Sequence, residues 1–445
     1  MTNIRDRSRN ILIVAPDKAL DLVLKKHVKT KKQRGCFEND EFYFYFDFYA
    51  VETPLDLGII YSNCCVIIDR ESIGCVIGIA DLGGIVQAAL VATYPHLTGP
   101  SFEGSYVCLN KYYTRQLVGS KASVNVAYDC TDVTRFDFAK KNHTPLSANN
   151  SFPVFVKPAM GTASCLVGVA REDESLRNQM KLIKNDVNGI IGPFRGLIEQ
   201  FLDLKKYPQA LDGLVMLEQY IDIIQEPVSI HGVDGLVSHG KIVPWAIGDN
   251  IYWPHRPQCF QGCGFPSALS RYTQEEIWKV FHALVENLNK FGFDNEFVDV
   301  ELFVFRDGTF KLMEINGRAF PFMFKIYDEI LNKGDMTEAY LSVNRGITPE
   351  QPTLKPNQFG LYAFLSTFGS GKVGDFINID KLADYSDISR FGFEVESPVE
   401  PKGESGFTLG YLSIIDVSYE ACLEKMHSIK TDLLKQPEFS PWWNN

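Results

Sequence analysis

The sequence has no excess of positive charge. Its formal net charge is −11 and its pI is near 5.3. A broad surface for nucleic acid or for an anionic membrane needs a basic face. The composition therefore argues against both kinds of partner, although it leaves room for a local basic pocket.

Two other absences bear on the cellular compartment. The ten cysteines include no Cys-x-x-Cys pair, and the first ten residues, MTNIRDRSRN, lack the apolar core of a signal peptide. The most apolar stretch, residues 75–94, is interrupted by Asp81 and by Gly83-Gly84. We therefore expect a cytoplasmic protein with mostly structural, reduced cysteines, and a buried strand followed by a packed helix within this stretch.

A dinucleotide-binding fingerprint is missing as well. The first buried strand, ILIVA at 11–15, is followed by Pro-Asp-Lys and not by G-x-G-x-x-G. The N-terminal unit is therefore not expected to bind NAD. Its alternating pattern nevertheless predicts a small doubly wound α/β domain over residues 1–108. Strands are expected at 11–15, 42–49, 65–69 and 75–79, and helices at 17–32 and 84–93.

The length of 445 residues suggests about three units, so the expected fold class is multidomain with α/β and α+β parts. A central unit covers 109–345. After Gly346 a new series of strand patterns begins and ends in a helix. This series predicts a C-terminal α+β domain over 346–445. Its strands are expected near 360–368, 391–396 and 410–415, and its last helix at 419–433.

The most informative stretch, residues 295–322, reads as a β-hairpin with its turn at 306–309. Glu301 falls on the outgoing arm and Glu314 on the returning arm. Asn316 shares the face of Glu314 because side chains alternate along a strand.

These three oxygen donors suit Mg²⁺. Arg318 follows Asn316 at the same interval of two, and its guanidinium suits a second anion beside the metal. An ordinary exposed hairpin with charges on its wet face is the alternative interpretation.

Three other features carry weaker signals. The small-residue loop 160–164 follows a strand that ends at Lys157, and such a loop can close its N–H groups on phosphate or simply be a tight turn. Lys111 and Arg115 share one helical face, which is either functional or solvated. Glu218 lies in the apolar strand 214–221 and needs a partner.

The segment 248–267 is rich in Pro, Gly and aromatic residues, and we expect it to be an irregular binding loop. Its candidate binding residues are Tyr252, Trp253, His255, Arg256 and Gln261. A helix at 173–184 precedes it, and an amphipathic helix at 274–291 follows it.

The order of these pieces resembles the ATP-grasp superfamily of carboxylate–amine ligases. NKYYTR is similar to the family's D-K-x-x-x-R segment, with Asn110 in place of the aspartate. FPVFVKP with its small loop resembles the second phosphate-binding lysine and the mobile loop. VMLEQYI resembles the hinge strand along adenine, and VDVELFVFRDGTFKLMEINGR resembles the metal hairpin.

The resemblance implies an ATP-grasp domain over 109–345 with a lid at about 145–214. The last hundred residues look like the C-terminal domain of the branch that includes L-amino-acid ligases and carnosine-synthase-like enzymes. This branch activates a small carboxylate, typically an amino acid, as an acyl phosphate and couples it to an amine. Its enzymes are often dimers, so a homodimer is implied.

The resemblance also assigns site residues. It implies nucleotide binding by Lys111, Lys157, Gly161, Thr162, Ser164, Glu218, Tyr220, Ile221 and Glu226. It implies that Glu301, Glu314 and Asn316 bind Mg²⁺, with Mn²⁺ as the alternative ion. Arg318 and Lys157 are the implied catalytic residues, and His255, Arg256, Gln261 and Arg318 are the implied contacts to substrate.

One departure bears on the substrate. Relatives that form dipeptides often place an acid before the FPS-like stretch, where this chain has Phe260-Gln261. This favours a different amine, or one not bound as an ammonium. Two other interpretations remain: a biosynthetic ATP-grasp ligase or carboxylase that does not act on amino acids, and an inactive ATP-binding scaffold.

Overall fold

The computed structural model describes residues 9–16, 18–33, 37, 39–45, 55–118, 124–139, 152–161, 166–253, 256–318, 320–385, 388–390, 395–401 and 406–435. Thr162, Ser164 and His255, which the sequence singled out, lie outside the described residues.

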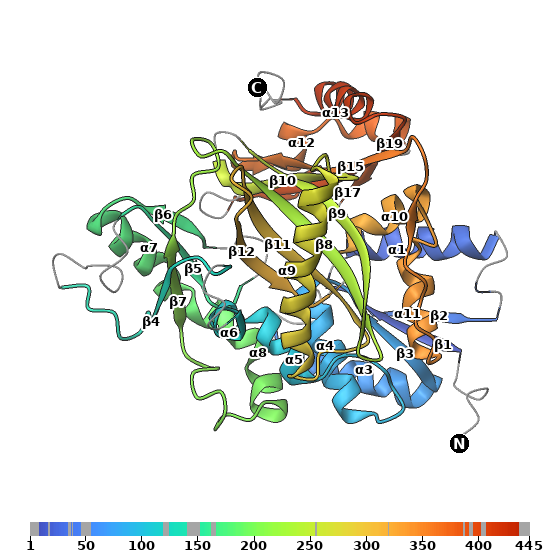
Figure 1. The fold of residues 1–445 in the computed structure, drawn as a ribbon, viewed down its shortest axis with the longest axis horizontal. Helices are drawn as coiled ribbons and strands as arrows, with labels where there is room; N and C mark the ends of the chain where they lie inside the picture. Colours follow the sequence, from blue (N-terminus) through green and yellow to red (C-terminus); the bar gives the residue numbers. More distant parts are fainter. Residues whose placement is uncertain are drawn as a thin grey trace.

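The N-terminal part is built on a three-stranded parallel sheet of order β2-β1-β3 (Figure 1). Its strands are β1 (Asn10–Val14), β2 (Glu41–Tyr45) and β3 (Ile73–Gly78), and its helices are α1 (Lys18–Gln33), α3 (Leu57–Glu71) and α4 (Ala80–Thr93). The helix α4 follows β3 directly and is buried along most of its length. It brings its first turn to the centre of the molecule.

The strand expected at 65–69 is wrong, because these residues belong to α3. The Asp56 side chain accepts a hydrogen bond from the Gly58 N–H and caps the helix. Leu57, Ile60, Cys64 and Ile68 follow at intervals of three and four and form its buried face. Considered alone, the short apolar run 65–69 has the pattern of a strand. The residues before it show the periodicity of a helix.

The second sheet has four strands in the order β4-β7-β5-β6 and lies at the left of Figure 1. Its elements are β4 (Tyr128–Asp132), β5 (Val154–Pro158), β6 (Gly168–Ala170), β7 (Leu214–Gln219), α7 (Asp173–Asn185) and α8 (Val187–Phe201). The sequence reading missed α8, which contains Pro193 and three glycines. Tertiary packing of Phe194, Leu197 and Ile198 offsets these poor helix formers.

The largest sheet has eight strands in the order β12-β11-β8-β9-β10-β15-β19-β17, and all of its pairs are antiparallel. Its strands are β8 (Val228–Ser238), β9 (Lys241–Trp253), β10 (Arg256–Phe265), β11 (Glu296–Phe305), β12 (Phe310–Asn316), β15 (Phe359–Thr367), β17 (Ile388–Arg390) and β19 (Phe407–Asp416). The helix α9 (Arg271–Asn289) crosses one face of this sheet (Figure 1).

The expectation that 248–267 is irregular is wrong, since β9 and β10 occupy most of it. The strand β10 pairs with β9 despite its irregular composition, because the pairing shifts register on both sides of Phe260. Glycine is required at Gly262, where a Cβ would lie 2.3 Å from the Tyr362 carbonyl oxygen of the neighbouring strand.

The C-terminal part extends this sheet, because β15 pairs with β10. The helix α13 (Tyr419–Leu433) has the bounds expected from the sequence and packs against β15 and β19. The expected strand at 391–396 lies mostly outside the described residues. Remaining elements are α5 (Phe102–Leu109), α6 (Lys111–Val118), α10 (Phe324–Ile330), α11 (Met336–Asn344), α12 (Val373–Phe376), β13 (Leu331–Asn332), β14 (Thr353–Leu354), β16 (Gly371–Lys372), β18 (Pro398–Val399), and the short 3-10 helices Pro321–Met323 and Ile379–Asp384.

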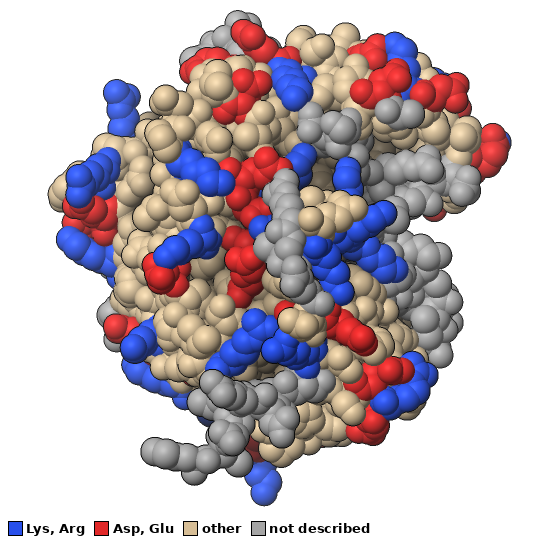
Figure 2. Space-filling view, turned by 90° about the vertical axis from the view of Figure 1, so that its right-hand side faces the viewer, with Lys and Arg blue, Asp and Glu red and all other residues tan. Residues whose placement is uncertain are grey.

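Charges of both signs are interspersed over the face drawn in Figure 2. Within the described part of the chain, no helix is long and apolar enough to cross a membrane.

Candidate active site

A cavity of about 580 Å³ lies between the N-terminal part, the four-stranded sheet and the eight-stranded sheet. The N-terminal part contributes the first turn of α4, the four-stranded sheet contributes β5 and the end of β7, and the large sheet contributes β8 to β12 and β15. Most of the charged residues that the sequence singled out line this cavity. It is therefore the candidate site.

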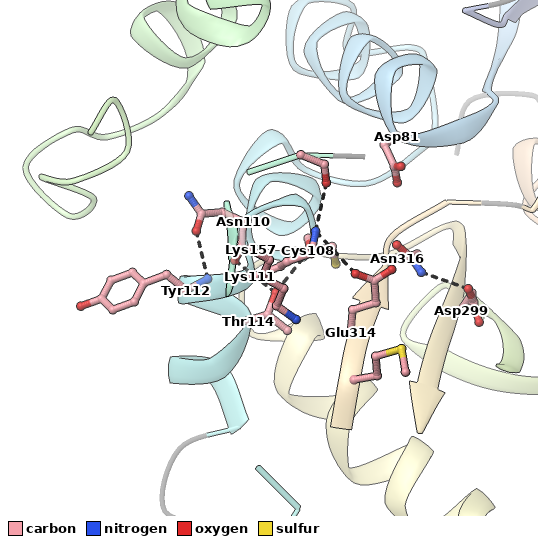
Figure 3. A network of polar contacts seen from close by, with 12 residues as sticks. Asp81, Cys108, Asn110, Lys111, Tyr112, Thr114, Lys157, Asp299, Glu314 and Asn316 are labelled. Carbon is pink, nitrogen blue, oxygen red and sulfur yellow. Dashed lines mark hydrogen bonds and ion pairs between the residues drawn. The ribbon is translucent and has the colours of Figure 1, made fainter. Parts of the chain in front are cut away.

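The β11–β12 hairpin confirms the expected pairing of acids. Glu301 and Glu314 lie directly opposite each other, and Asp299 lies opposite Asn316. Asn316 Nδ2 donates a hydrogen bond to Asp299 Oδ2 at 3.0 Å (Figure 3). This bond uses the amide nitrogen and leaves the Asn316 oxygen for another partner.

Asp299 was missed by the sequence reading. It lies two residues before Glu301, so strand alternation places both on one face. The same rule that selected Asn316 from Glu314 would have found it.

The hairpin concentrates negative charge in a buried place. Burial, followed by the neighbouring carboxylates Glu314 and Asp299, raises the pKa of Glu301 well above its ordinary value. Burial also acts to raise the pKa of Glu314, but the attraction of nearby cations, Lys111 first, outweighs it and the net shift is downward. Such a pair of acids requires a cation between them or beside them.

The donor set fits Mg²⁺, which prefers oxygen and uses one or two carboxylates together with water and phosphate. Among the described residues, no three His, Cys, Asp or Glu side chains converge tightly enough to form a metal site by themselves. The amide oxygen of Asn316 and oxygens from a bound phosphate would complete the shell around Glu301 and Glu314.

Two lysines reach this region from other elements. Lys111 Nζ, from α6, lies 3.5 Å from Glu314 Oε2 and donates to the Gly161 carbonyl oxygen at 3.0 Å (Figure 3). Lys157, from β5, is buried and also lines the cavity. Both ammonium groups therefore border the space above the acidic hairpin.

Glu218 has the partners that its apolar strand required. Its Oε2 lies 2.8 Å from Lys157 Nζ, and its Oε1 accepts from Arg115 Nε at 2.9 Å. Burial would raise the pKa of Glu218, but Arg115 and Lys157 lower it to about 2. The carboxylate is therefore ionised and holds both cations in place.

Arg115 does not lie on a solvated face, because it is only 2% exposed. Besides Glu218 it binds the Met313 carbonyl oxygen at 2.7 Å, next to Glu314. The triad of Arg115, Glu218 and Lys157 thus connects α6, β5 and β7 to the β11–β12 hairpin.

The other residues that the resemblance assigns to nucleotide binding divide into two groups. Tyr220, Ile221 and Gly161 line the cavity, and Gly161 has φ of +150°, which disfavours a side chain there. Glu226 is exposed and accepts a bond from the Asp222 N–H at 3.3 Å, and it is not among the residues that line the cavity.

Arg318 is buried at the junction with the N-terminal part. Its Nε lies 3.1 Å from Asp81 Oδ1, and its Nη1 lies 3.9 Å from Asp299 Oδ2. The sequence reading noted Asp81 only as an interruption of the most apolar stretch. A lone acid in such a stretch signals a buried partner, which here is Arg318.

The residues proposed from segment 248–267 are only partly at the cavity. Tyr252 and Trp253 line it, whereas Arg256 stacks over Phe368 at 4.2 Å from the ring centre and is not among the lining residues. Gln261 is buried away from the lining, and Phe260 occupies the wall instead.

No protein-family model and no curated protein sequence matches the chain significantly. Solved structures do resemble it. The L-amino acid ligase from Bacillus licheniformis aligns with a TM-score of 0.70 and 14% identity over 97% of this chain and 100% of that chain.

Two other structures have similar coverage. The N5-carboxyaminoimidazole ribonucleotide synthetase purK, in an ADP complex, aligns with a TM-score of 0.63 and 12% identity over 96% of this chain and 98% of that one. The biotin carboxylase from Campylobacter jejuni aligns with a TM-score of 0.60 and 15% identity over 96% and 91%. The chain therefore has the ATP-grasp fold, as the sequence resemblance predicted.

Proposed function

We propose that this protein is an ADP-forming ligase that joins a small carboxylate, an amino acid in the first instance, to an amine. The observation that carries the proposal is the cavity itself. Two opposed carboxylates, Glu301 and Glu314, face two lysines from other elements, Lys111 and Lys157. A nucleoside triphosphate with its metal ion has the charge pattern that this arrangement complements.

Each group of residues has its own role in the proposed reaction. Tyr220 and Ile221, which follow β7 directly and line the cavity, would contact the adenine, and Glu218 is a further candidate there. Lys111 and Lys157 would neutralise the phosphates, and Thr162 and Ser164, which lie outside the described residues, are proposed as further contacts to them. Glu301, Glu314 and Asn316 would hold Mg²⁺, which neutralises phosphate charge that otherwise repels an incoming carboxylate.

The proposed reaction has two steps. A carboxylate oxygen of the acid attacks the γ-phosphorus of ATP, the bond to the bridging oxygen breaks, and ADP leaves. The amine nitrogen then attacks the carbonyl carbon of the acyl phosphate, inorganic phosphate leaves, and the nitrogen loses a proton. Arg318, which lines the cavity, would bind the substrate carboxylate and the charge that develops on the adduct.

Exclusion of water is a requirement of this chemistry, because water would hydrolyse the acyl phosphate. Lys157 and Arg318, which line the cavity, are at most 9% exposed. Their burial supports acyl transfer to an amine over simple ATP hydrolysis.

The test is analysis of the nucleotide products. The purified protein is incubated with Mg²⁺, ATP and pools of amino acids, and the nucleotides are separated. We expect ADP and phosphate with particular pools, and a hydroxamate when hydroxylamine replaces the amine, because hydroxylamine traps acyl phosphates. The Glu314→Ala variant controls for contaminating ATPases. AMP and pyrophosphate as products would show adenylation and refute the proposal.

A further inference from the structure

One wall of the cavity is made almost entirely of aromatic rings. Five rings from three separate segments converge there. We call them the aromatic wall, and its members are Phe260, Phe320, Phe322, Tyr362 and Phe364. The segments are β10, the turn after β12, and β15.

The rings contact one another directly. Phe322 is central: its ring centre lies 5.3 Å from Phe320, 5.9 Å from Tyr362 and 5.3 Å from Phe364. Phe260 lies 5.8 Å from Tyr362 and 5.9 Å from Phe364. These are the separations of ordinary packed aromatic pairs, so the wall is a preformed surface.

The wall is not simply part of the core. Tyr362 is 1% exposed, but the four phenylalanines are each only partly buried, and all of them line the cavity. Part of their surface is therefore available to a group bound in the cavity. Covering such rings with an apolar group is favourable, since the contribution grows with the apolar area removed from water.

The charges around the wall argue for a neutral ligand group. The carboxylates that line the cavity are Asp81, Glu218, Asp234, Asp299, Glu301 and Glu314. None of these belongs to β10 or β15, and the charges of Glu301 and Asp299 act on Tyr362 from the neighbouring hairpin. The cation Arg256 already lies over Phe368, which also lines this end. An aromatic cage for an ammonium group would not place a guanidinium at its edge.

The wall begins at the anion-binding arginine. The Arg318 guanidinium lies 5.4 Å from the centre of the Phe320 ring. A ligand whose carboxylate meets Arg318 can therefore place a side chain on the wall without leaving the cavity. The lining thus joins a charged contact and an apolar surface within one site.

We infer that one substrate of this ligase carries a neutral aromatic side chain close to a carboxylate, as an aromatic amino acid does. The inference rests on the proposed ligase function, and it adds the substrate class. The ring packs against the aromatic wall while the carboxylate meets Arg318. The ring-bearing molecule is either the acid that is phosphorylated or the amine that attacks, and the two are distinguished below.

The test is direct binding, which does not depend on turnover. Calorimetry in the presence of Mg²⁺ and a non-hydrolysable ATP analogue compares L-phenylalanine and 3-phenylpropionate with L-alanine, L-lysine and L-aspartate. We expect at least one of the two aromatic probes to bind about tenfold or more tightly than the other three. Equal binding of alanine, tighter binding of lysine or aspartate, or no binding of either aromatic probe would overturn the inference.

Two variants locate the binding. Phe364→Leu removes a ring of the wall, and we expect it to weaken binding of the aromatic probe about three- to tenfold. Phe310→Leu is the matched control, because Phe310 is partly buried on β12 but does not line the cavity. Both variants must bind the ATP analogue as the wild type does. Equal loss in both, or loss in neither, would contradict a binding role for the wall.

A turnover assay then shows whether the ring belongs to the phosphorylated acid or to the attacking amine. It also distinguishes failure of the aromatic-substrate inference from failure of the ligase function. Hydroxamate formed from an aromatic acid places the ring on the phosphorylated substrate. Hydroxamate formed only from a small acid, with phenylalanine consumed as the acceptor, places it on the amine. Turnover confined to polar or charged substrate pairs would refute this inference while leaving the ligase function intact. Binding of an aromatic probe without formation of any acyl phosphate would refute the ligase function and leave the aromatic binding site intact.

Discussion

Lys157 and Glu218 form a buried ion pair, with 2.8 Å between Nζ and Oε2, on the neighbouring strands β5 and β7. Arg115 occupies the other carboxylate oxygen. A single anion therefore holds two cations, and one of these borders the cavity. Glu218 acts here as a positioning residue for Lys157, whatever contact it also makes with a nucleotide.

This triad predicts a specific loss of stability in acid. The pKa of Glu218 is about 2 in the folded protein, below its ordinary value of 4.5, so the unfolded chain binds the proton more readily. The resulting stabilisation is fully present above about pH 4.5 and is lost as the pH falls towards 2. It is on the order of 3 kcal/mol.

Urea unfolding of the wild type and of Glu218→Gln between pH 7 and pH 2.5 measures this contribution. The variant should be less stable at pH 7, because it leaves two buried cations uncompensated. The difference in free energy of unfolding should shrink as the pH falls below 4.5. Glu286→Gln, an exposed glutamate on α9, is the control. A difference that does not change with pH would contradict the assignment.

The hairpin acids predict a loss of turnover without a loss of fold. Glu314→Ala removes one of the two opposed carboxylates, and we expect the rate of ADP formation to fall by roughly a hundredfold or more. Glu314 lies at the cavity and not in a core cluster. The circular dichroism spectrum of the Glu314→Ala variant should therefore match that of the wild type. Glu286→Ala is the matched control. Activity near that of the wild type would show that the hairpin is not the metal site.

Asp299 makes a different prediction, about metal affinity. It accepts the amide hydrogen bond of Asn316 and so orients the oxygen that would bind the metal. Asp299→Asn keeps an acceptor but removes the charge, and changes of this kind typically cost about 10- to 100-fold in metal affinity. The Mg²⁺ concentration for half-maximal ADP formation should rise accordingly at saturating ATP. An unchanged Mg²⁺ requirement would remove Asp299 from the site.

Local patterns predicted the hairpin well, because alternation and a turn sequence specify both arms and their facing acids. Glu301 and Glu314 are opposed as expected, and α13 begins and ends where its pattern does. The resemblance to ATP-grasp enzymes predicted the overall fold. These features depend on neighbours in the sequence or on a recognisable order of motifs.

Features that depend on distant partners were not predictable in the same way. Asp81 and Arg318 are 237 residues apart, and Arg115 and Glu218 are 103 apart. Nothing local shows that these residues pair, although a lone acid in an apolar stretch signals that some partner exists. The strand β10 was missed for a related reason: Gly262 permits close approach of β15, which composition alone cannot show.

The pairing of Arg318 with Asp81 leads to the last prediction. Asp81 holds Nε at 3.1 Å and fixes the plane of the guanidinium, while Nη1 has no hydrogen-bond partner among the described residues. Arg318→Lys keeps the positive charge but cannot bind a carboxylate with two parallel hydrogen bonds. We expect the KM for the carboxylate substrate to rise about 10- to 100-fold and the KM for ATP to change little.

Asp81→Asn should raise the KM for the carboxylate substrate by a smaller factor. The amide oxygen of the new side chain still accepts the hydrogen bond from Arg318 Nε, but the negative charge that attracts the guanidinium is lost. Arg306→Lys, on the exposed turn of the same hairpin, is the control for a general effect of the substitution. Initial rates at varied carboxylate and varied ATP separate the two KM values. If Arg318→Lys raises both equally, Arg318 supports the fold of the cavity and does not select the carboxylate.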